Sequence, residues 1–234
     1  MTSLKTYSLL LFDLDHTLWD FENNSRETLE VLFGKYDLEN KGIAGFKHFF
    51  EIFSRINMQL WDFHDRNLIG QEVIRLQRFN KVFSAAGLED YPLSLLFSDE
   101  YHLELPKRKN LLPYAIETLD YLHVKYPMVI VTNGFNEMQQ TKMHSSGINH
   151  YFKSIVTSQR AGDKKPSKQI FDFTLEEAGH AHNSVIMIGD NLQTDIVGAR
   201  MAGIDTVYFN PNSKPHSEEV THEIKSLKEL QVFL

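Results

Sequence analysis

Residues 9–17 read Leu9-Leu10-Leu11-Phe12-Asp13-Leu14-Asp15-His16-Thr17. An apolar run that passes directly into carboxylates is typical of a buried strand that ends at a polar loop. An isolated Asp-x-Asp is usually a pair of solvated aspartates in a turn. Here the wholly apolar residues before Asp13, and the hydroxyl of Thr17 after Asp15, favour a functional site. We therefore expect both aspartates at the carboxyl end of a first, buried strand.

Short apolar runs alternate with helical patterns along the rest of the chain. Five runs are typical of strands: Tyr7–Phe12, Met128–Thr132, Ser154–Thr157, Ser184–Ile188 and Asp205–Phe209. Helical patterns lie between the later runs, over residues 114–125, 136–146, 167–178 and 194–202. This alternation predicts parallel strands joined by crossover helices. The expected fold class is α/β, with a Rossmann-like doubly wound parallel sheet as its core.

Local signals mark the ends of several of these helices. Gly147, Gly179 and Gly203 each follow a helical pattern, where a left-handed C-terminal cap favours glycine. The sequence Ser226-Leu227-Lys228-Glu229 is a capping-box pattern, which predicts a short last helix.

A long segment without strand patterns separates the first two strands. Its helical stretches cover residues 25–36, 46–63, 71–85 and 93–103. Insertions of this size at the active edge of a sheet commonly act as lids. We therefore expect a Rossmann-like catalytic core formed by residues 1–20 plus 106–234. Residues 21–105 are expected to form a helical-bundle cap inserted after the first strand.

Three more polar fragments follow later in the chain. They are Thr132-Asn133-Gly134, Lys165-Pro166, and Gly189-Asp190 with Asp195. In open α/β sheets, ligands bind at the edge formed by the carboxyl ends of the strands. Carboxylates that hold a hard cation, together with donors for a phosphoryl group, indicate metal-assisted phosphoryl transfer. Because Lys164 precedes Lys165, charge alone does not decide which lysine takes part.

The composition excludes several kinds of protein and site. The chain has 234 residues and no cysteine, so it has neither disulfides nor thiolate metal sites, which fits a cytoplasmic protein. A net charge of −7 argues against a nucleic-acid polymer as partner. A small anionic substrate remains compatible, because one metal ion reverses the local field. No run approaches the ~18 apolar residues of a membrane span, and no Gly-x-Gly dinucleotide fingerprint is present.

The ordered set of fragments resembles the haloacid dehalogenase superfamily of phosphohydrolases. The shared pattern is Asp-x-Asp-x-Thr, then Thr-Asn-Gly, then Lys-Pro, then Gly-Asp-x4-Asp, with a helical insertion after the first strand. Residues 11–19 and 132–135 look like the branch of pyrimidine and deoxynucleoside 5′-monophosphatases. The resemblance implies an enzyme, a phosphatase that hydrolyses phosphoric monoesters, whose partner is a small phosphorylated metabolite such as a nucleotide.

The resemblance also implies roles for the residues after the first strand. Asp13 matches the nucleophile that forms an aspartyl-phosphate. Asp15 matches the acid that protonates the leaving group and then the base that activates water. The implied cofactor is Mg²⁺, held by Asp13, the Asp15 backbone carbonyl and Asp190. His16 stands where many relatives carry glycine, and we expect little consequence.

The remaining fragments are implied to bind the phosphoryl group. Thr132, Asn133 and Gly134 match the phosphate-binding turn, and Thr132 is expected to donate a hydrogen bond to a phosphoryl oxygen. Lys165 matches the lysine that neutralises charge on the phosphoryl group and on the nucleophile. Asp195 is expected to support the metal or to orient this lysine.

Other activities share parts of this pattern. A sugar-phosphate or phosphoglycolate phosphatase and a phosphomutase have the same core motifs, because the cap selects the substrate. A haloacid dehalogenase is a further alternative, but dehalogenases of this superfamily lack the second aspartate, so Asp15 argues against it. A phospho-accepting receiver module is the non-enzyme alternative. Its acceptor follows the third strand, whereas Asp13 follows the first.

Overall fold

The described chain divides into two compact units. The computed structural model describes residues 6–234. One unit consists of residues 6–21 together with 109–234, and the other of residues 22–108. Residues 1–5, which belong to the predicted core, lie outside the described residues. The role of residues 21–105 as a cap stays a prediction.

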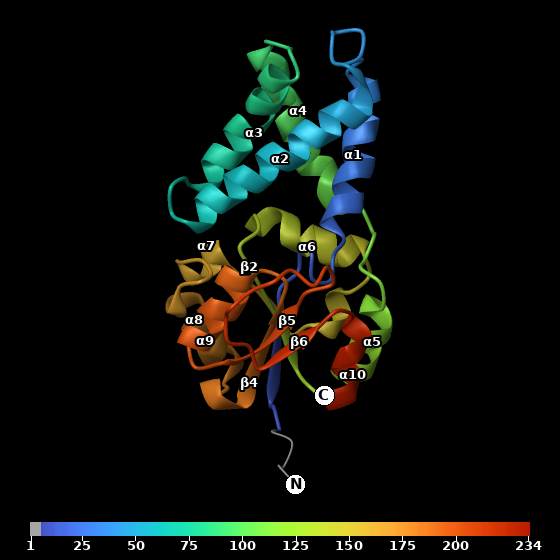
Figure 1. The fold of residues 1–234 in the computed structure, drawn as a ribbon. Helices are drawn as coiled ribbons and strands as arrows, with labels where there is room; N and C mark the ends of the chain where they lie inside the picture. The colour runs from blue at the N-terminus through green and yellow to red at the C-terminus, as the bar shows by residue number, and fades with distance from the viewer. Residues whose placement is uncertain (1–5) are drawn as a thin grey trace. The chain divides into compact units, whose positions relative to one another are not determined.

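A six-stranded parallel sheet forms the centre of the first unit (Figure 1). The strands are β1 (Leu9–Phe12), β2 (Met128–Thr132), β3 (Ser154–Thr157), β4 (Val185–Gly189), β5 (Asp205–Phe209) and β6 (His222–Ile224). Their order in the sheet is β3-β2-β1-β4-β5-β6, and every neighbouring pair is parallel. This is the doubly wound order, which confirms the predicted Rossmann-like fold class.

The strand order places a topological switch point between β1 and β4. From β1 the chain adds β2 and β3 on one side, and then returns to add β4, β5 and β6 on the other. The register pairs Leu9 with Val185 and Phe12 with Ile188, so the ends of the two strands lie within one residue of each other. The residues directly after β1 and β4 therefore meet where such sheets bind their ligands.

Helices connect and cover the strands of this unit. They are α5 (Ala115–His123), α6 (Asn136–Ser145), α7 (Ser158–Ala161), α8 (Lys168–Ala178), α9 (Gly198–Met201) and α10 (Leu230–Phe233). Apolar side chains of β1, β2 and β4 pack with α8 residues such as Ile170 and Phe171 in one buried cluster. This burial is the main force that fixes the strand ends. No helix within residues 6–234 is long and apolar enough to cross a membrane.

Most predicted element bounds lie within two residues of the observed ones, but α1 begins at Phe21 and not at residue 25. β6 and α7 were not predicted. They are three and four residues long, respectively, which is too short to show a hydrophobic periodicity in the sequence. The helix predicted over 194–202 begins as a π-helix, Leu192–Val197, before α9. The helix predicted from residue 167 begins at Lys168, with Ser167 as its N-cap.

The predicted helix-end signals are confirmed. Gly147, Gly179 and Gly203 all have φ between 70° and 78°, the left-handed conformation that glycine adopts without strain. The Ser226 side chain and Glu229 form both halves of the capping box ahead of α10.

The regular elements of residues 22–108 are all helical. They are α1 (Phe21–Lys35), α2 (Gly45–Asp65), α3 (Gln71–Ala85), α4 (Tyr91–Glu104) and a 3₁₀ turn at Leu105–Lys107 (Figure 1). Aromatic side chains fill the interior of this unit: Phe49, Phe53, Phe79, Phe83 and Phe97 are all buried. Their ring centroids lie 4.8–6.2 Å apart, a distance at which edge-to-face packing adds to the burial of area.

Candidate active site

Asp13 lies at the carboxyl end of β1, in the middle of the sheet. Its backbone N–H donates to the Ile188 carbonyl at 2.9 Å, which continues the β1–β4 ladder by one residue. The residue is 8% exposed, and its Oδ1 lies 2.6 Å from the Lys165 ammonium. The carboxylate is therefore held by the sheet on one side and by a buried cation on the other.

Asp15 begins a tight turn that returns the chain after β1. The backbone N–H groups of Leu18 and Trp19 both donate to the Leu14 carbonyl, and that of His16 donates to the Trp19 carbonyl. His16 has φ 64°, the left-handed region that glycine adopts without strain. This backbone requirement explains why glycine suits the position, and the exposed imidazole of His16 lies 5.0 Å from the Phe21 ring, centroid to centroid.

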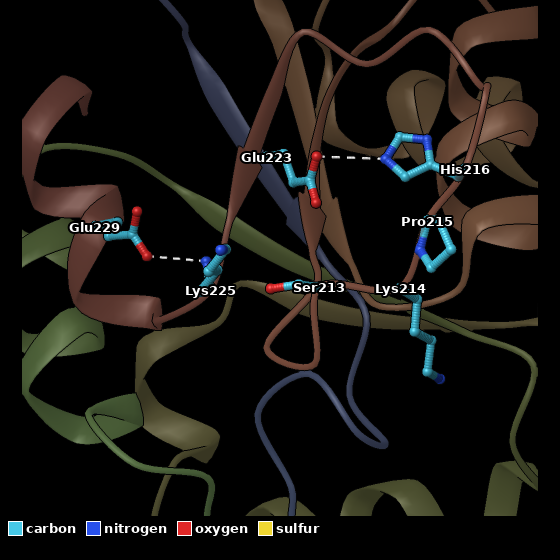
Figure 2. A pocket seen from close by; sticks show the side chains of 7 residues that line it. All are labelled: Ser213, Lys214, Pro215, His216, Glu223, Lys225 and Glu229. Carbon is cyan, nitrogen blue, oxygen red and sulfur yellow. Dashed lines mark hydrogen bonds and ion pairs between the residues drawn. The ribbon is translucent and has the colours of Figure 1, made fainter.

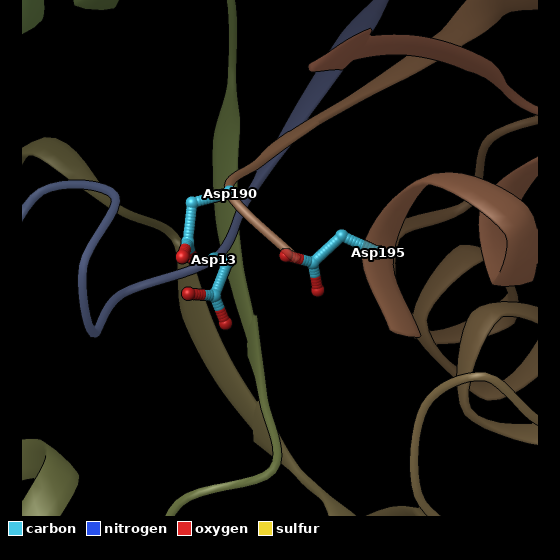
Figure 3. Close-up of side chains that lie close together, drawn as sticks. All are labelled: Asp13, Asp190 and Asp195. Carbon is cyan, nitrogen blue, oxygen red and sulfur yellow. The ribbon is translucent and has the colours of Figure 1, made fainter. Parts of the chain in front are cut away.

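Asp190 follows β4 and is held by the turn after β1. The Thr17 hydroxyl donates to Asp190 Oδ1 at 3.2 Å and accepts from the Asp190 backbone N–H at 3.1 Å. Figure 3 shows the Asp190 and Asp13 carboxylates side by side, with Asp195 reaching toward them from the π-helical turn. Carboxylate oxygens of the three aspartates all lie within 4.8 Å of one another. The structure thus brings together residues 182 positions apart in the chain.

Lys165 is the cation of this cluster. It is 1% exposed, and its Nζ lies 2.6 Å from Asp13 Oδ1, 2.7 Å from Asp195 Oδ1 and 2.7 Å from the Val131 carbonyl. The side-chain amide of Asn133 both donates to the Lys165 carbonyl and accepts from its N–H, each at 2.9 Å. The turn after β2 therefore fixes the backbone that carries the lysine.

Asp195 is fixed by the loop after β4. Its Oδ2 accepts the Asn191 backbone N–H at 3.0 Å, and the residue is 1% exposed. A Cβ at Gly189 would overlap this carboxylate, so only glycine leaves room for it at the end of β4. Asp195 thereby presents its other oxygen to Lys165, which is one of the two arrangements expected from the sequence.

The turn after β2 reaches the same edge of the sheet. Thr132 is 2% exposed, and its hydroxyl accepts the Gly134 backbone N–H at 3.0 Å. A Cβ at Gly134 would overlap the side-chain amide of Gln139, so this turn lies directly against α6. Helix α6 begins at Asn136, two residues beyond Gly134. Backbone N–H groups at such a helix start suit an anion.

Burial sets the protonation of the carboxylates. It raises the pKa of Asp13 from 3.8 to about 8, with Lys165 opposing the rise and the other two aspartates adding to it. Burial likewise raises the pKa of Asp190 to about 7, and repulsion from Asp195 adds to this. Burial lowers the pKa of Lys165, but Asp13 and Asp195 more than offset the effect, so the lysine stays charged. Lys165 pairs with Asp13 and Asp195 but not with Asp190, so the three aspartates are a group that could hold a metal ion.

Sequence reasoning missed two residues that contact the predicted ones, and it noted Thr17 without assigning it a partner. Thr17 binds Asp190, Gln139 lies against Gly134, and Lys142 binds Asp15. Gln139 and Lys142 lie on the buried face of α6 beside Met138 and Met143, and are 1% and 2% exposed. Lys142, on the core-facing side of its helix, could have indicated this contact. A buried lysine is rare unless its charge is paired.

A pocket of about 480 Å³ lies beside β6, the last strand in the order of the sheet. It is lined by Ser213, Lys214, Pro215, His216, Glu223, Lys225 and Glu229 (Figure 2). Glu223 lies 3.3 Å from His216, and Glu229 accepts the Lys225 backbone N–H at 2.8 Å. Both of its carboxylates are thus held by partners within the pocket.

Comparisons with known proteins agree with this geometry. A model of the haloacid dehalogenase-like hydrolase family matches residues 10–209. The HAD-hydrolase YfnB of Bacillus subtilis is 30% identical over 99% of this chain and 97% of its own. Its magnesium-bound crystal structure superposes with a TM-score of 0.86 and covers 97% of each chain.

Two further relatives are named for an activity. Pyrimidine 5′-nucleotidase PynA of Streptococcus pneumoniae is 31% identical over 96% of this chain and 93% of its own. Pyrimidine 5′-nucleotidase YjjG of Escherichia coli is 29% identical over 96% of each chain. These matches confirm the expectation of an enzyme, a phosphatase. The chain belongs to the haloacid dehalogenase-like hydrolase family.

Proposed function

We propose that the protein is an Mg²⁺-dependent phosphomonoesterase that acts on nucleoside 5′-monophosphates through an aspartyl-phosphate on Asp13. The observation that carries the proposal is the placement of Asp13. It ends β1 at the switch point of the sheet, bound to the Lys165 ammonium at 2.6 Å and within 4.8 Å of two further carboxylates. A second carboxylate, Asp15, follows two residues later in the turn.

The donors fit a hard divalent cation. Lys165 occupies Asp195 and one oxygen of Asp13, which leaves the second Asp13 oxygen, Asp190 and the Asp15 backbone carbonyl as ligands. All three are oxygen donors, the kind that Mg²⁺ prefers. Bound there, Mg²⁺ would neutralise charge on the carboxylates and on the phosphoryl oxygens.

In the proposed mechanism, residues of the chain carry out two half-reactions: formation of the aspartyl-phosphate and its hydrolysis. An Asp13 oxygen attacks phosphorus as the bond to the leaving oxygen breaks, and Asp15 gives its proton to that oxygen. Asp15, now a carboxylate, takes a proton from water as the water attacks the aspartyl-phosphate. Inorganic phosphate leaves and Asp13 is regenerated. Lys165 and Thr132 offset charge on the transferred group throughout.

The substrate class is inferred from the relatives. PynA and YjjG, both named pyrimidine 5′-nucleotidases, match more than nine-tenths of this chain. The helical unit, residues 22–108, enters the chain directly after the turn that carries Asp15. We place the selection of the leaving nucleoside in this unit, as a cap. The phosphoryl group is bound by the edge of the sheet.

A phosphate-release panel tests the function. With Mg²⁺ present, nucleoside monophosphates, sugar phosphates and phosphoglycolate are compared at equal concentration. We expect the highest kcat/KM for pyrimidine and deoxypyrimidine nucleoside 5′-monophosphates. A preference for a sugar phosphate or for phosphoglycolate would contradict the substrate class. A single stoichiometric labelling of the protein without turnover would contradict the enzyme itself.

Mg²⁺ binding should strengthen as the pH rises. The ligands must be deprotonated to bind metal, whereas Asp13 and Asp190 have pKa values of about 8 and about 7 without it. Because these values exceed the unfolded one of 3.8, the metal-free protein loses stability as the pH rises toward about 8. The increase in Tm on adding Mg²⁺ should therefore be larger at about pH 8 than at about pH 6.

A variant isolates the site responsible for this shift. Asp190→Asn removes one ligand and should lose most of the Mg²⁺-induced increase in Tm at both pH values. Asp172→Asn changes a carboxylate in an exposed ion pair with Lys168, and should keep the wild-type increase. An increase in Tm that is larger at the lower pH would contradict this assignment of ligands.

A further inference from the structure

Lys142 is a buried cation that the reaction described above does not use. It lies on α6, 2% exposed, with its Nζ 2.7 Å from both carboxylate oxygens of Asp15. With both oxygens engaged by one ammonium, the carboxylate has a fixed direction. The partner residues are 127 positions apart, so the contact depends on the fold and not on local sequence.

The same ammonium also contacts the turn that carries Asp15. It lies 4.5 Å from the centroid of the Trp19 ring, which is fully buried. Trp19 closes the turn by donating its backbone N–H to the Leu14 carbonyl at 2.8 Å. A desolvated cation over an indole ring is attracted by the negative face of the ring. One side chain of α6 therefore holds both the start and the end of the turn.

The two aspartates have separate lysines. Lys165 binds Asp13 and Asp195, whereas Lys142 binds Asp15. The Asp15 carboxylate is not among the three that lie within 4.8 Å of one another. Lys142 thus keeps the Asp15 side chain apart from the carboxylate cluster, although the two residues Asp13 and Asp15 are almost adjacent in sequence.

We propose that Lys142 is a positioning residue, which holds the Asp15 carboxylate in the orientation from which it exchanges protons with the leaving group and with water. The proposal rests on the proposed phosphatase function and deepens it. Lys142 binds the side-chain carboxylate of Asp15, so we assign it a role that acts through Asp15. Without it, the carboxylate is free to rotate about its side-chain bonds and loses its approach to the reacting atoms.

Steady-state kinetics of three variants test the positioning role. Lys142→Met keeps the length of the side chain without its charge and should lower kcat roughly 10²-fold, the cost of a small misplacement, with little change in KM. Lys142→Arg can still bind both oxygens and should recover most of kcat. Lys168→Met removes an exposed lysine that pairs with Asp172 and should match wild type. Unchanged kcat in Lys142→Met would overturn the proposal.

A double-mutant cycle separates this role from direct binding. If Lys142 acts only through Asp15, Lys142→Met should have no further effect on kcat in the Asp15→Asn background. A raised KM, or an equal loss of kcat in both backgrounds, would mean that Lys142 contacts the substrate, and would overturn the proposal. If Lys142→Met fails to fold, Lys142→Gln, which also removes the charge, carries the same comparison in the two backgrounds.

Tryptophan fluorescence tests the contact independently of activity. The chain has two tryptophans, so Trp61→Phe leaves Trp19 as the only emitter. Asp15→Asn should release the Lys142 ammonium and so shift the emission of Trp19. In the Lys142→Met background, the same substitution should leave the emission unchanged. No shift in the presence of Lys142 would overturn the proposal. Absence of phosphate release from the wild type, with the shift observed, would instead contradict the proposed function alone.

Discussion

Asp13→Asn should reduce phosphate release by at least about 10⁴-fold, because it removes the proposed nucleophile of the first half-reaction. The asparagine amide has nearly the shape of the carboxylate but cannot attack phosphorus to form an acyl-phosphate. Every later step depends on that intermediate, so Mg²⁺ or high substrate concentration should not restore turnover. Release of phosphate from a nucleoside monophosphate is the direct measurement.

The same substitution should leave the fold intact. Asp13 is buried, and its pKa is raised to about 8 because burial disfavours the charged form. A neutral amide avoids that cost, and Lys165 keeps its second partner, Asp195, at 2.7 Å. The Tm should stay close to that of wild type. Asp62→Asn, in an exposed pair with Arg66, is the control for an aspartate outside the site. Turnover retained by Asp13→Asn would contradict the nucleophile assignment.

The elements that carry the site were predictable because they are short and buried. β2, β3 and β5 begin and end at the predicted residues, since each is an apolar run bounded by polar or turn-forming residues. Parallel strands place their carboxyl ends at one edge, so Asp13, Thr132 and Asp190 had to lie near one another. The order of the fragments along the chain therefore predicted which residues lie near Asp13.

The contacts that orient the site were not predictable. Thr17 binds Asp190 across 173 residues, and Lys142 binds Asp15 across 127. Neither spacing leaves a local pattern, because the partners meet only after the sheet has formed and α6 has packed. The side-chain amide of Asn133 is a similar case. It was expected in the phosphate-binding turn, and the structure shows it bound to the backbone of Lys165.

Lys165→Met should destabilise the protein by about 3–5 kcal/mol near pH 8, the usual cost of leaving a buried charge without its partner. The substitution leaves Asp13 and Asp195 buried without the ammonium that lies 2.6 and 2.7 Å from them. Asp13 already has a raised pKa, and loss of the cation raises it further. A group whose pKa is raised by folding loses stability as the pH rises, so the deficit should be smaller near pH 5. Chemical denaturation at both pH values measures this difference.

Mg²⁺ separates the structural role of Lys165 from its proposed catalytic role. A divalent cation at Asp13 and Asp190 offsets part of the unpaired negative charge, so Mg²⁺ should restore part of the lost free energy of unfolding. It should not restore turnover, because no ammonium then offsets charge on the transferred phosphoryl group. Lys168→Met, in an exposed pair, should change stability by no more than about 1 kcal/mol. A Lys165→Met protein as stable as wild type at pH 8 would show that the aspartate cluster does not depend on this lysine. The metal ion would then be the cation that neutralises the carboxylates.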